Sequence, residues 1–271
     1  MPIIGIDYDK CINCGTCLTA CVDPGRFFKK DEEKDIMIFE DPEKGCILCG
    51  QCIAQCPEEA ILYEDMGESF TFEKINNPEK LISYDTLFNF ISANRSVRKY
   101  KKEKVSKEIL EKVLMAMARA PTAANMRTEQ FTVLSDSKKI KELNDAIREE
   151  FYKDPSLKSQ TEHQFEAFGQ YFESPLYYDA PHIIFVSSSF NMMMEGFNIG
   201  IIVTYGRLAA QTLGLGTCWN GYTEMAMTQF PQLKKLLKLR GHVFGVFTLG
   251  YPDVKYHRIP PRAMNKVKFI D

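Results

Sequence analysis

The sequence lacks any long apolar run. Its longest apolar stretches, Ile183–Val186 and Ile199–Val203, fall far short of the roughly 20 residues that a membrane-spanning helix needs. The first nine residues have neither the basic start nor the apolar centre of a secretory signal. From these two absences we expect a soluble, cytoplasmic protein with no membrane partner.

Histidine is scarce, and the common nucleotide-binding loops are missing. The four histidines are scattered and show no metal-ligand spacing. Neither a Walker-type loop nor a G-x-G-x-x-G motif is present, so we expect no dedicated nicotinamide-binding unit. A short basic run at 99–104 has no interleaved aromatic residue beyond Tyr100, which argues against a nucleic-acid partner.

The net charge of −2 is small, but it is distributed unevenly. Residues 1–65 carry 6 Lys+Arg and 14 Asp+Glu, a balance of −8, and the remainder carries 28 and 22, a balance of +6. An acidic electron carrier joined to a more basic domain would favour electrostatic docking between them. An acidic surface that only keeps the first domain soluble explains the same imbalance equally well.

What the sequence does contain is two cysteine runs near its start, each spaced C-x-x-C-x-x-C-x-x-x-C. This spacing is typical of bacterial two-cluster ferredoxins, in which the fourth cysteine of each run binds the other cluster. We therefore predict two 4Fe–4S clusters. One would be held by Cys11, Cys14, Cys17 and Cys56, and the other by Cys46, Cys49, Cys52 and Cys21.

Two other uses of these cysteines fit the sequence less well. A zinc site needs four ligands from two pairs and would leave the third cysteine of each run unexplained. A disulfide scaffold would require an oxidising compartment, and the sequence shows no export signal. The first run departs from the ferredoxin pattern at one point, because Cys21 is followed by Val22-Asp23-Pro24 rather than directly by proline.

The chain is long enough for two domains. We predict a cluster domain at 1–65, a polar linker at 66–82 and a larger domain at 83–271. Periodicity and capping residues predict an α+β sandwich with helices near 83–93, 106–120, 136–152, 165–178, 195–213 and 223–239. They also predict strands near 2–8, 36–39, 61–63, 131–134, 182–187, 243–249 and 267–270.

Four motifs follow one another in the larger domain. They are Arg95-Ser96-x-Arg98, Pro121-Thr122-Ala123-Ala124-Asn125, the glycine-rich stretch 214–221, and 249–252 followed by Arg258 and Arg262. In this order, over roughly residues 83–271, they resemble the nitroreductase family of FMN enzymes. The resemblance implies an α+β fold with a central, mostly antiparallel sheet, and the whole chain is similar to a ferredoxin–nitroreductase fusion.

The resemblance also implies roles for these residues. Arg95, Ser96 and Arg98, with Arg258 or Arg262, would hold the FMN phosphate, although the first three alone also fit the start of a solvated basic loop. Pro121, Thr122, Ala123 and Asn125 would approach the flavin ring, unless Asn125 is an ordinary turn residue. The glycine-rich stretch ends in four residues that would contact the flavin ring, unless they form only a turn: Cys218, Trp219, Asn220 and Gly221. The Cys218 thiol itself is expected to be a packed apolar group.

The sequence therefore predicts an FMN-dependent oxidoreductase in which electrons from the clusters pass through the flavin to a nitro, quinone or enone acceptor. The donor could be a ferredoxin or flavodoxin. Two alternatives stay open: NAD(P)H as donor with the clusters as electron exit, and a non-catalytic electron carrier or redox sensor.

No catalytic side chain is identified, and the aromatic segment 165–178 could shape the acceptor pocket. The family further implies a homodimer with FMN between subunits and an exchanged C-terminal strand.

Overall fold

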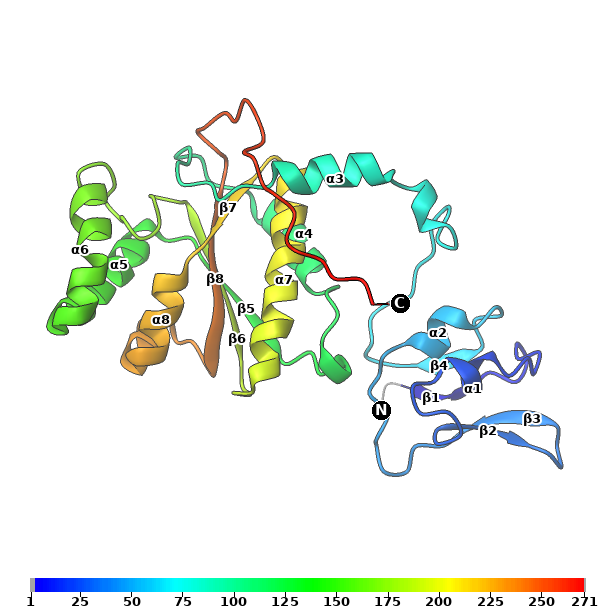
Figure 1. The fold of residues 1–271 in the computed structure, drawn as a ribbon. Coiled ribbons are helices and arrows are strands. Elements are labelled where there is room, and N and C mark those ends of the chain that lie inside the picture. Colours follow the sequence, from blue (N-terminus) through cyan, green and yellow to red (C-terminus); the bar gives the residue numbers. More distant parts are fainter. Residues whose placement is uncertain (1–2, 271) are drawn as a thin grey trace. The chain divides into compact units, whose positions relative to one another are not determined.

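A computed structural model of the chain describes residues 3–270 (Figure 1). It divides into two compact units. The first consists of Met1–Ile82 together with Thr122–Met126, and the second of Ser83–Pro121 and Arg127–Asp271. The linker that the sequence predicts at 66–82 is counted with the first unit and contains one short helical turn, η1 (Pro78–Lys80).

The first unit is built from two small antiparallel sheets and two short helices. Strand β1 (Ile3–Ile6) pairs with β4 (Ile61–Tyr63), and β2 (Phe28–Asp31) pairs with β3 (Ile36–Phe39). The strands predicted at 36–39 and 61–63 are confirmed, whereas β2 was not predicted. The helices α1 (Thr16–Ala20) and α2 (Gln51–Gln55) are too short to show a periodic apolar face, so sequence periodicity could not reveal them.

The second unit has a four-stranded antiparallel sheet in the order β5-β6-β8-β7. The strands are β5 (Glu129–Leu134), β6 (His182–Ser188), β7 (Gly216–Trp219) and β8 (His242–Gly250). Every residue of β6 is buried, because helices cover both faces of the sheet (Figure 1). The predicted α+β class with a mostly antiparallel sheet is confirmed.

Two sets of helices pack on the two faces. Helices α4 (Lys107–Met117) and α7 (Met193–Thr212) share a core with Ile184 and Val186 of β6. Helices α5 (Ser137–Lys153), α6 (Pro155–Gly169) and α8 (Gly221–Gln229) share the other core with Ile183 and Phe185. The alternation along β6 follows from the two-residue period of a strand. A further helix, α3 (Tyr84–Ala93), precedes α4 and buries none of its side chains.

Two predicted helices and one predicted strand differ from the structure. The helix expected at 165–178 is wrong in its bounds: α6 spans Pro155–Gly169, because Asp154 caps it and Pro155 begins it, and the chain after Gly169 forms turns. The expected helix at 223–239 begins instead at Gly221, since Asn220 accepts the Thr223 N–H at 2.9 Å as its N-cap. It ends at Gln229 before Pro231, which starts the separate turn η3 (Pro231–Leu237). The predicted strand at 267–270 is wrong for the single chain: this segment is irregular and exposed, and no strand of the described residues pairs with it.

No helix among the described residues has both the length and the apolar character needed to cross a bilayer. This agrees with the short apolar runs in the sequence.

His182, at the start of β6, is buried between two polar contacts. Its Nε2 accepts the backbone N–H of Val105 at 3.0 Å, and its Nδ1 lies 2.7 Å from the Ser135 hydroxyl. Because Nε2 is an acceptor, the ring must be neutral in this arrangement. Burial, aided by the charge of Lys104, lowers the pKa of His182 below its usual value of 6.5.

We predict that acid destabilises the protein partly through His182. As pH falls below about 6.5, the unfolded chain takes up the proton before the folded one, so stability is complete above this pH and declines below it. The free energy of unfolding, measured anaerobically by denaturant titration between about pH 7.5 and about pH 5.5, should fall less steeply for His182→Gln. The matched control, His257→Gln at an exposed position, should keep the wild-type slope. Equal slopes for both variants would contradict the assignment.

Candidate functional site

The eight N-terminal cysteines line two separate cavities in the first unit. Cys11, Cys14, Cys17 and Cys56 surround one of about 350 Å³, part of it open to solvent. Cys21, Cys46, Cys49 and Cys52 surround the other, of about 370 Å³. In each cavity three cysteines come from one run and the fourth from the other. Among the described residues no three cysteine, histidine or carboxylate side chains converge closely enough to hold a single metal ion.

The two cysteine loops repeat one backbone conformation. Asn13 and Leu48, which precede the second cysteine of each run, have φ values of 56° and 57°. Gly15 and Gly50, which follow that cysteine, have φ values of 73° and 72°. Left-handed residues of this kind direct successive N–H groups to one side and form concave anion-binding loops. A leucine in this region costs roughly 1–2 kcal/mol, so the loop of the second run is held there against its local preference.

Backbone amides reach two sulfurs of the first cavity, and mainly apolar side chains line both cavities. The N–H of Asn13 donates to the Cys11 sulfur at 3.4 Å, and the N–H of Ala60 donates to the Cys56 sulfur at 3.3 Å. Hydrogen bonds of this type tune the reduction potential of an iron–sulfur cluster. Apart from Thr16 and Glu58 in the first cavity and Gln51 in the second, the remaining lining is apolar and includes Met37 and Phe28. Such a lining restricts water and lowers the local dielectric constant.

Burial controls the ionisation of the cysteine thiols. Desolvation raises the pKa of Cys17 and Cys46, and it raises that of Cys52 to about 11. The hydroxyl and backbone of Thr16 lower the pKa of the exposed Cys14. A thiolate in an apolar cavity needs a bound cation to compensate its charge. The donor set of four cysteines per cavity therefore fits an iron–sulfur cluster.

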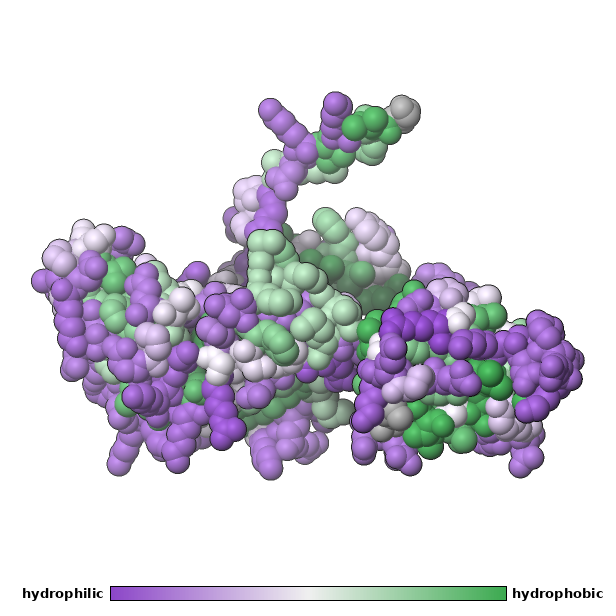
Figure 2. Space-filling view, turned by 90° about the horizontal axis from the view of Figure 1, so that it is seen from below, coloured by the Kyte–Doolittle hydropathy of each residue, from purple (hydrophilic) through white to green (hydrophobic). Residues whose placement is uncertain are grey.

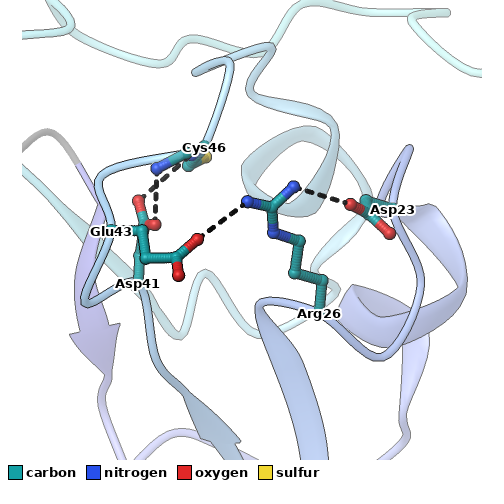
Figure 3. Close-up of polar contacts among 6 residues, drawn as sticks. Asp23, Arg26, Asp41, Glu43 and Cys46 are labelled. Carbon is teal, nitrogen blue, oxygen red and sulfur yellow. Dashed lines mark hydrogen bonds and ion pairs between the residues drawn. The ribbon is translucent and has the colours of Figure 1, made fainter.

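Charged side chains brace the loop that leads into the second run (Figure 3). The Asp41 carboxylate accepts the backbone N–H of Gly45 at 2.7 Å and that of Cys46 at 3.1 Å. Arg26 contacts both Asp23 and Glu43 at 3.3 Å and thereby joins the segments before and after the β2–β3 hairpin. These ion pairs are exposed and contribute little each. The two bonds to Asp41 determine where Cys46 enters the cavity.

In the second unit, three of the four motifs lie together at one edge of the sheet. The segment Asn94–Tyr100 runs beside β7, where Ser96 pairs with Thr217 and the Val97 N–H donates to the Thr217 carbonyl at 2.9 Å. It continues beside the end of β8, where Tyr100 pairs with Pro252. The Arg95-Ser96-x-Arg98 motif, the glycine-rich stretch and the 249–252 motif are therefore neighbours in space.

Gly216 permits this close approach. A Cβ atom at this position would lie 2.6 Å from the Val97 side chain, inside the distance that real Cβ atoms tolerate. The sequence analysis treated the stretch 214–221 as a loop, but residues 216–219 form β7. The glycine is thus needed to pack the Val97 side chain against the β7 backbone.

The predicted phosphate-binding residues have different surroundings. Arg95 is half-buried and donates to two carbonyls at the end of α3, those of Asn94 at 2.8 Å and Ser92 at 2.7 Å. Arg98 is exposed and interacts with the Tyr178 hydroxyl. Two further arginines of the prediction, Arg258 and Arg262, are exposed in the irregular segment after β8.

The residues at the end of the glycine-rich stretch are largely occupied by the fold itself. Cys218 is buried within β7, as the sequence predicted for its thiol. The Trp219 ring N–H donates to Glu224 at 3.2 Å. Asn220 donates its own N–H to Val246 and caps α8, and Gly221 is the first residue of that helix. Gly221 is exposed at the N-terminus of α8.

The remaining motif, 121–125, is grouped mostly with the first unit. Its residues Thr122–Met126 include Asn125, whose side-chain amide donates to the carbonyl oxygens of Ile47 at 3.1 Å and Leu48 at 2.8 Å. Those two carbonyls lie between Cys46 and Cys49. Ala124 and Asn125 both have positive φ, 49° and 51°, which is uncommon for residues other than glycine. Pro121 precedes this segment and belongs to the second unit.

One basic residue at the sheet edge escaped the sequence analysis. Arg207 of α7 donates through Nε to the Thr217 hydroxyl and through Nη2 to the Asn94 side chain, each at 3.2 Å. After Glu195 it is the only charged residue of α7. That isolation was a usable signal, because a half-buried charge needs a specific partner.

Comparison with known proteins gives matches for both parts of the chain. The family model described as "Nitroreductase family" matches residues 91–251, more than half of the chain, and that of a "4Fe-4S dicluster domain" matches residues 10–61. Ferredoxin-3 of Nostoc is 32% identical over 75 residues, which cover 22% of this chain and 76% of the ferredoxin.

The second part has relatives in sequence and structure. A protein of Methanothermobacter thermautotrophicus, whose name places it among NADH dehydrogenases or NAD(P)H nitroreductases, is 29% identical over 60% of this chain and 75% of its own length. The crystal structure of an FMN-bound nitroreductase from Bacteroides fragilis is 25% identical, with a TM-score of 0.56 over 67% of this chain and 98% of that chain. One from Desulfitobacterium hafniense, 20% identical, shares the fold with a TM-score of 0.57 over 68% and 97%.

The cysteine cavities, the edge of the antiparallel sheet and these matches agree with one another. The resemblance predicted from the motifs is confirmed: this chain is an oxidoreductase of the nitroreductase family that carries an N-terminal 4Fe–4S dicluster domain.

Proposed function

We propose that this protein binds two 4Fe–4S clusters and FMN, and that it passes electrons from the clusters through the flavin to a small organic acceptor. The observation that carries this proposal is the presence, in one chain, of two four-cysteine cavities and a sheet edge where three flavin-type motifs meet. The acceptor class would be a nitro compound, a quinone or an activated alkene.

The chain's residues fit both cofactors. A bound flavin would supply the conversion between the single electrons of the clusters and the two-electron reduction of an organic acceptor. In the first unit, the crossed cysteines would hold each cluster, and Asp41 would hold the loop that presents Cys46. In the second unit, Ser96 and Arg98 offer a hydroxyl and a guanidinium suited to a phosphate monoester. The N-terminus of α8 at Gly221 offers backbone N–H groups to the flavin ring.

A second donor is favoured by one comparison. The Methanothermobacter relative carries NAD(P)H in its name, and it is similar to the nitroreductase part of this chain. In this alternative NAD(P)H would reduce the flavin directly, and the clusters would carry electrons away. The two directions differ in whether flavin reduction needs intact clusters.

We predict that the cysteines act in the crossed sets that line the cavities. Cys11→Ser/Cys56→Ser removes two residues of one cavity, so one cluster should be lost and iron should fall from about eight to about four atoms per chain. Cys11→Ser/Cys21→Ser removes one residue from each cavity, so both clusters should be lost. Iron and sulfide analysis after anaerobic reconstitution measures both results.

The control for this experiment is Cys218→Ser, which changes the ninth cysteine, buried in β7, and should keep the full iron content. The opposite pattern, in which Cys11→Ser/Cys21→Ser loses one cluster and Cys11→Ser/Cys56→Ser loses both, would mean that each run serves its own cluster.

We predict that reduced ferredoxin bleaches the bound flavin only when the clusters are present. The reconstituted protein and a sample stripped of iron by chelation should both contain FMN, and both should be titrated anaerobically. Absorbance of the flavin in the reconstituted protein should fall with two electrons per flavin, while the stripped protein should stay oxidised.

NAD(P)H added to the same two samples separates the alternatives. Rapid bleaching of both samples by NAD(P)H would favour the reverse direction of flow. Reduction of the clusters with an oxidised flavin would refute the proposal, and failure of the folded protein to bind FMN would support an electron carrier or sensor.

We also propose that the second unit forms a homodimer through an exposed apolar surface. Phe197, Ile201 and Tyr205 follow one another at helical spacing on α7 and are 64%, 41% and 42% exposed. Helix α3 buries no side chain and exposes Tyr84 at 75%. Apolar surface of this kind on two helices is typical of a protein–protein interface.

The C-terminal segment extends this apolar surface. Phe269 and Ile270 are each 83% exposed, and Figure 2 shows the segment that ends with them projecting from its unit with its apolar atoms uncovered. Val267, Lys268 and Phe269 alternate in character as a strand does, and a strand requires a partner. A second copy of the chain would supply one, in agreement with the exchange that the family implies.

We predict that Phe197→Glu/Ile201→Glu converts the dimer into monomers, because two carboxylates would be buried without partners at the interface. Sedimentation velocity should give a dimer for the wild type and for the control Tyr171→Glu, which changes another exposed aromatic residue. A monomeric wild-type protein with bound FMN would rule out the dimer.

A further inference from the structure

Arg207 reaches the phosphate-type motif from a different part of the chain. It lies on α7, more than a hundred residues after Arg95-Ser96-x-Arg98, and its guanidinium contacts Asn94 directly before that motif. It also contacts the hydroxyl of Thr217, whose backbone pairs with Ser96 and Val97. Arg207 is therefore held against both β7 and the 94–100 segment that carries the motif.

The surroundings of Arg207 leave its charge without a balancing group. Its two hydrogen-bond acceptors, the Asn94 amide oxygen and the Thr217 hydroxyl, are both neutral. Within residues 3–270 it forms no ion pair with a carboxylate, although the side chain is half-buried. A half-buried guanidinium with neutral partners is costly unless an anion joins it. The two hydrogen bonds use two of the five guanidinium N–H donors, so three donors remain available to bind an anion.

Neighbouring side chains fix the direction of this guanidinium. Gln211 lies one turn further along α7 and donates to the Phe90 carbonyl at 2.7 Å. Its side-chain oxygen accepts the Asn94 amide at 2.6 Å, which turns the Asn94 oxygen toward Arg207. A rigidly placed fork is the arrangement that suits bidentate binding of a phosphate.

We propose that Arg207 is a phosphate-binding residue for the flavin, which acts with Ser96 and Arg98 on the terminal phosphate of FMN. This assignment rests on the proposed function, because it concerns the flavin site of the second unit. It explains why α7 carries one arginine at the sheet edge and why Asn94 and Thr217 orient it. It also separates Arg207 from Arg95, whose guanidinium is bonded to carbonyls of α3.

The test compares two flavins that differ only in the phosphate. FMN and riboflavin would be titrated against the reconstituted full-length protein, and their dissociation constants would be measured from quenching of flavin fluorescence. Arg207→Gln should weaken FMN binding about 10-fold to 100-fold, as expected for loss of a charge-assisted hydrogen bond, and should leave riboflavin binding unchanged. Arg207→Lys should recover part of the loss, because it keeps the charge without the fork.

Two controls make the result specific. Arg240→Gln removes an exposed positive charge beyond η3 and should change neither dissociation constant. Added inorganic phosphate should weaken FMN binding in the wild type and have little effect in Arg207→Gln. Riboflavin binding also reports whether each variant is folded.

The possible outcomes are distinct. Equal losses of FMN and riboflavin affinity in Arg207→Gln would mean that Arg207 only stabilises the packing of α7 against β7, and would overturn the proposal. Unchanged affinity for both flavins would overturn it as well. A wild-type protein that binds neither flavin would instead refute the proposed function.

Discussion

The backbone pairing between Val97 and Thr217 is the interaction on which the arrangement of the flavin-type motifs depends. It joins a segment that follows α3 to a strand more than a hundred residues later. The pairing is possible because position 216 has no side chain, which lets the Val97 side chain pack directly on the β7 backbone. The pairing places Ser96 beside β7, a strand that Arg207 contacts at Thr217 and that leads directly into α8.

The first unit depends on a different constraint. Its sheets have two strands each, and its two helices are five residues long, so little apolar surface is available to stabilise it. Its core includes Cys17 and Cys52, and other cysteines pack against that core. Burial that raises thiol pKa values is unfavourable for thiolates unless a metal centre is bound. Folding of this unit and binding of its clusters are therefore expected to be coupled.

The sequence analysis succeeded where the signal was local and periodic. Cysteine spacing indicated the ferredoxin-type domain, and alternating or helical apolar patterns indicated β6, α4 and α5. It failed at short elements such as α1, which span too few residues for a pattern to emerge. It also misread 216–219 as a loop, because glycine is a turn signal in sequence and serves as a packing residue in the fold.

By itself, the sequence determined the family, the α+β class and the crossed grouping expected of the cysteines, because those properties reside in spacing and order along the chain. Only the tertiary structure decided which side chains meet. It placed Arg207 against Asn94 and Thr217, directed Arg95 to carbonyls of α3, and used Asn220 as a helix cap. These outcomes depend on hydrogen bonds between residues distant in sequence, and the three-dimensional packing of α7 against the sheet edge selects among them.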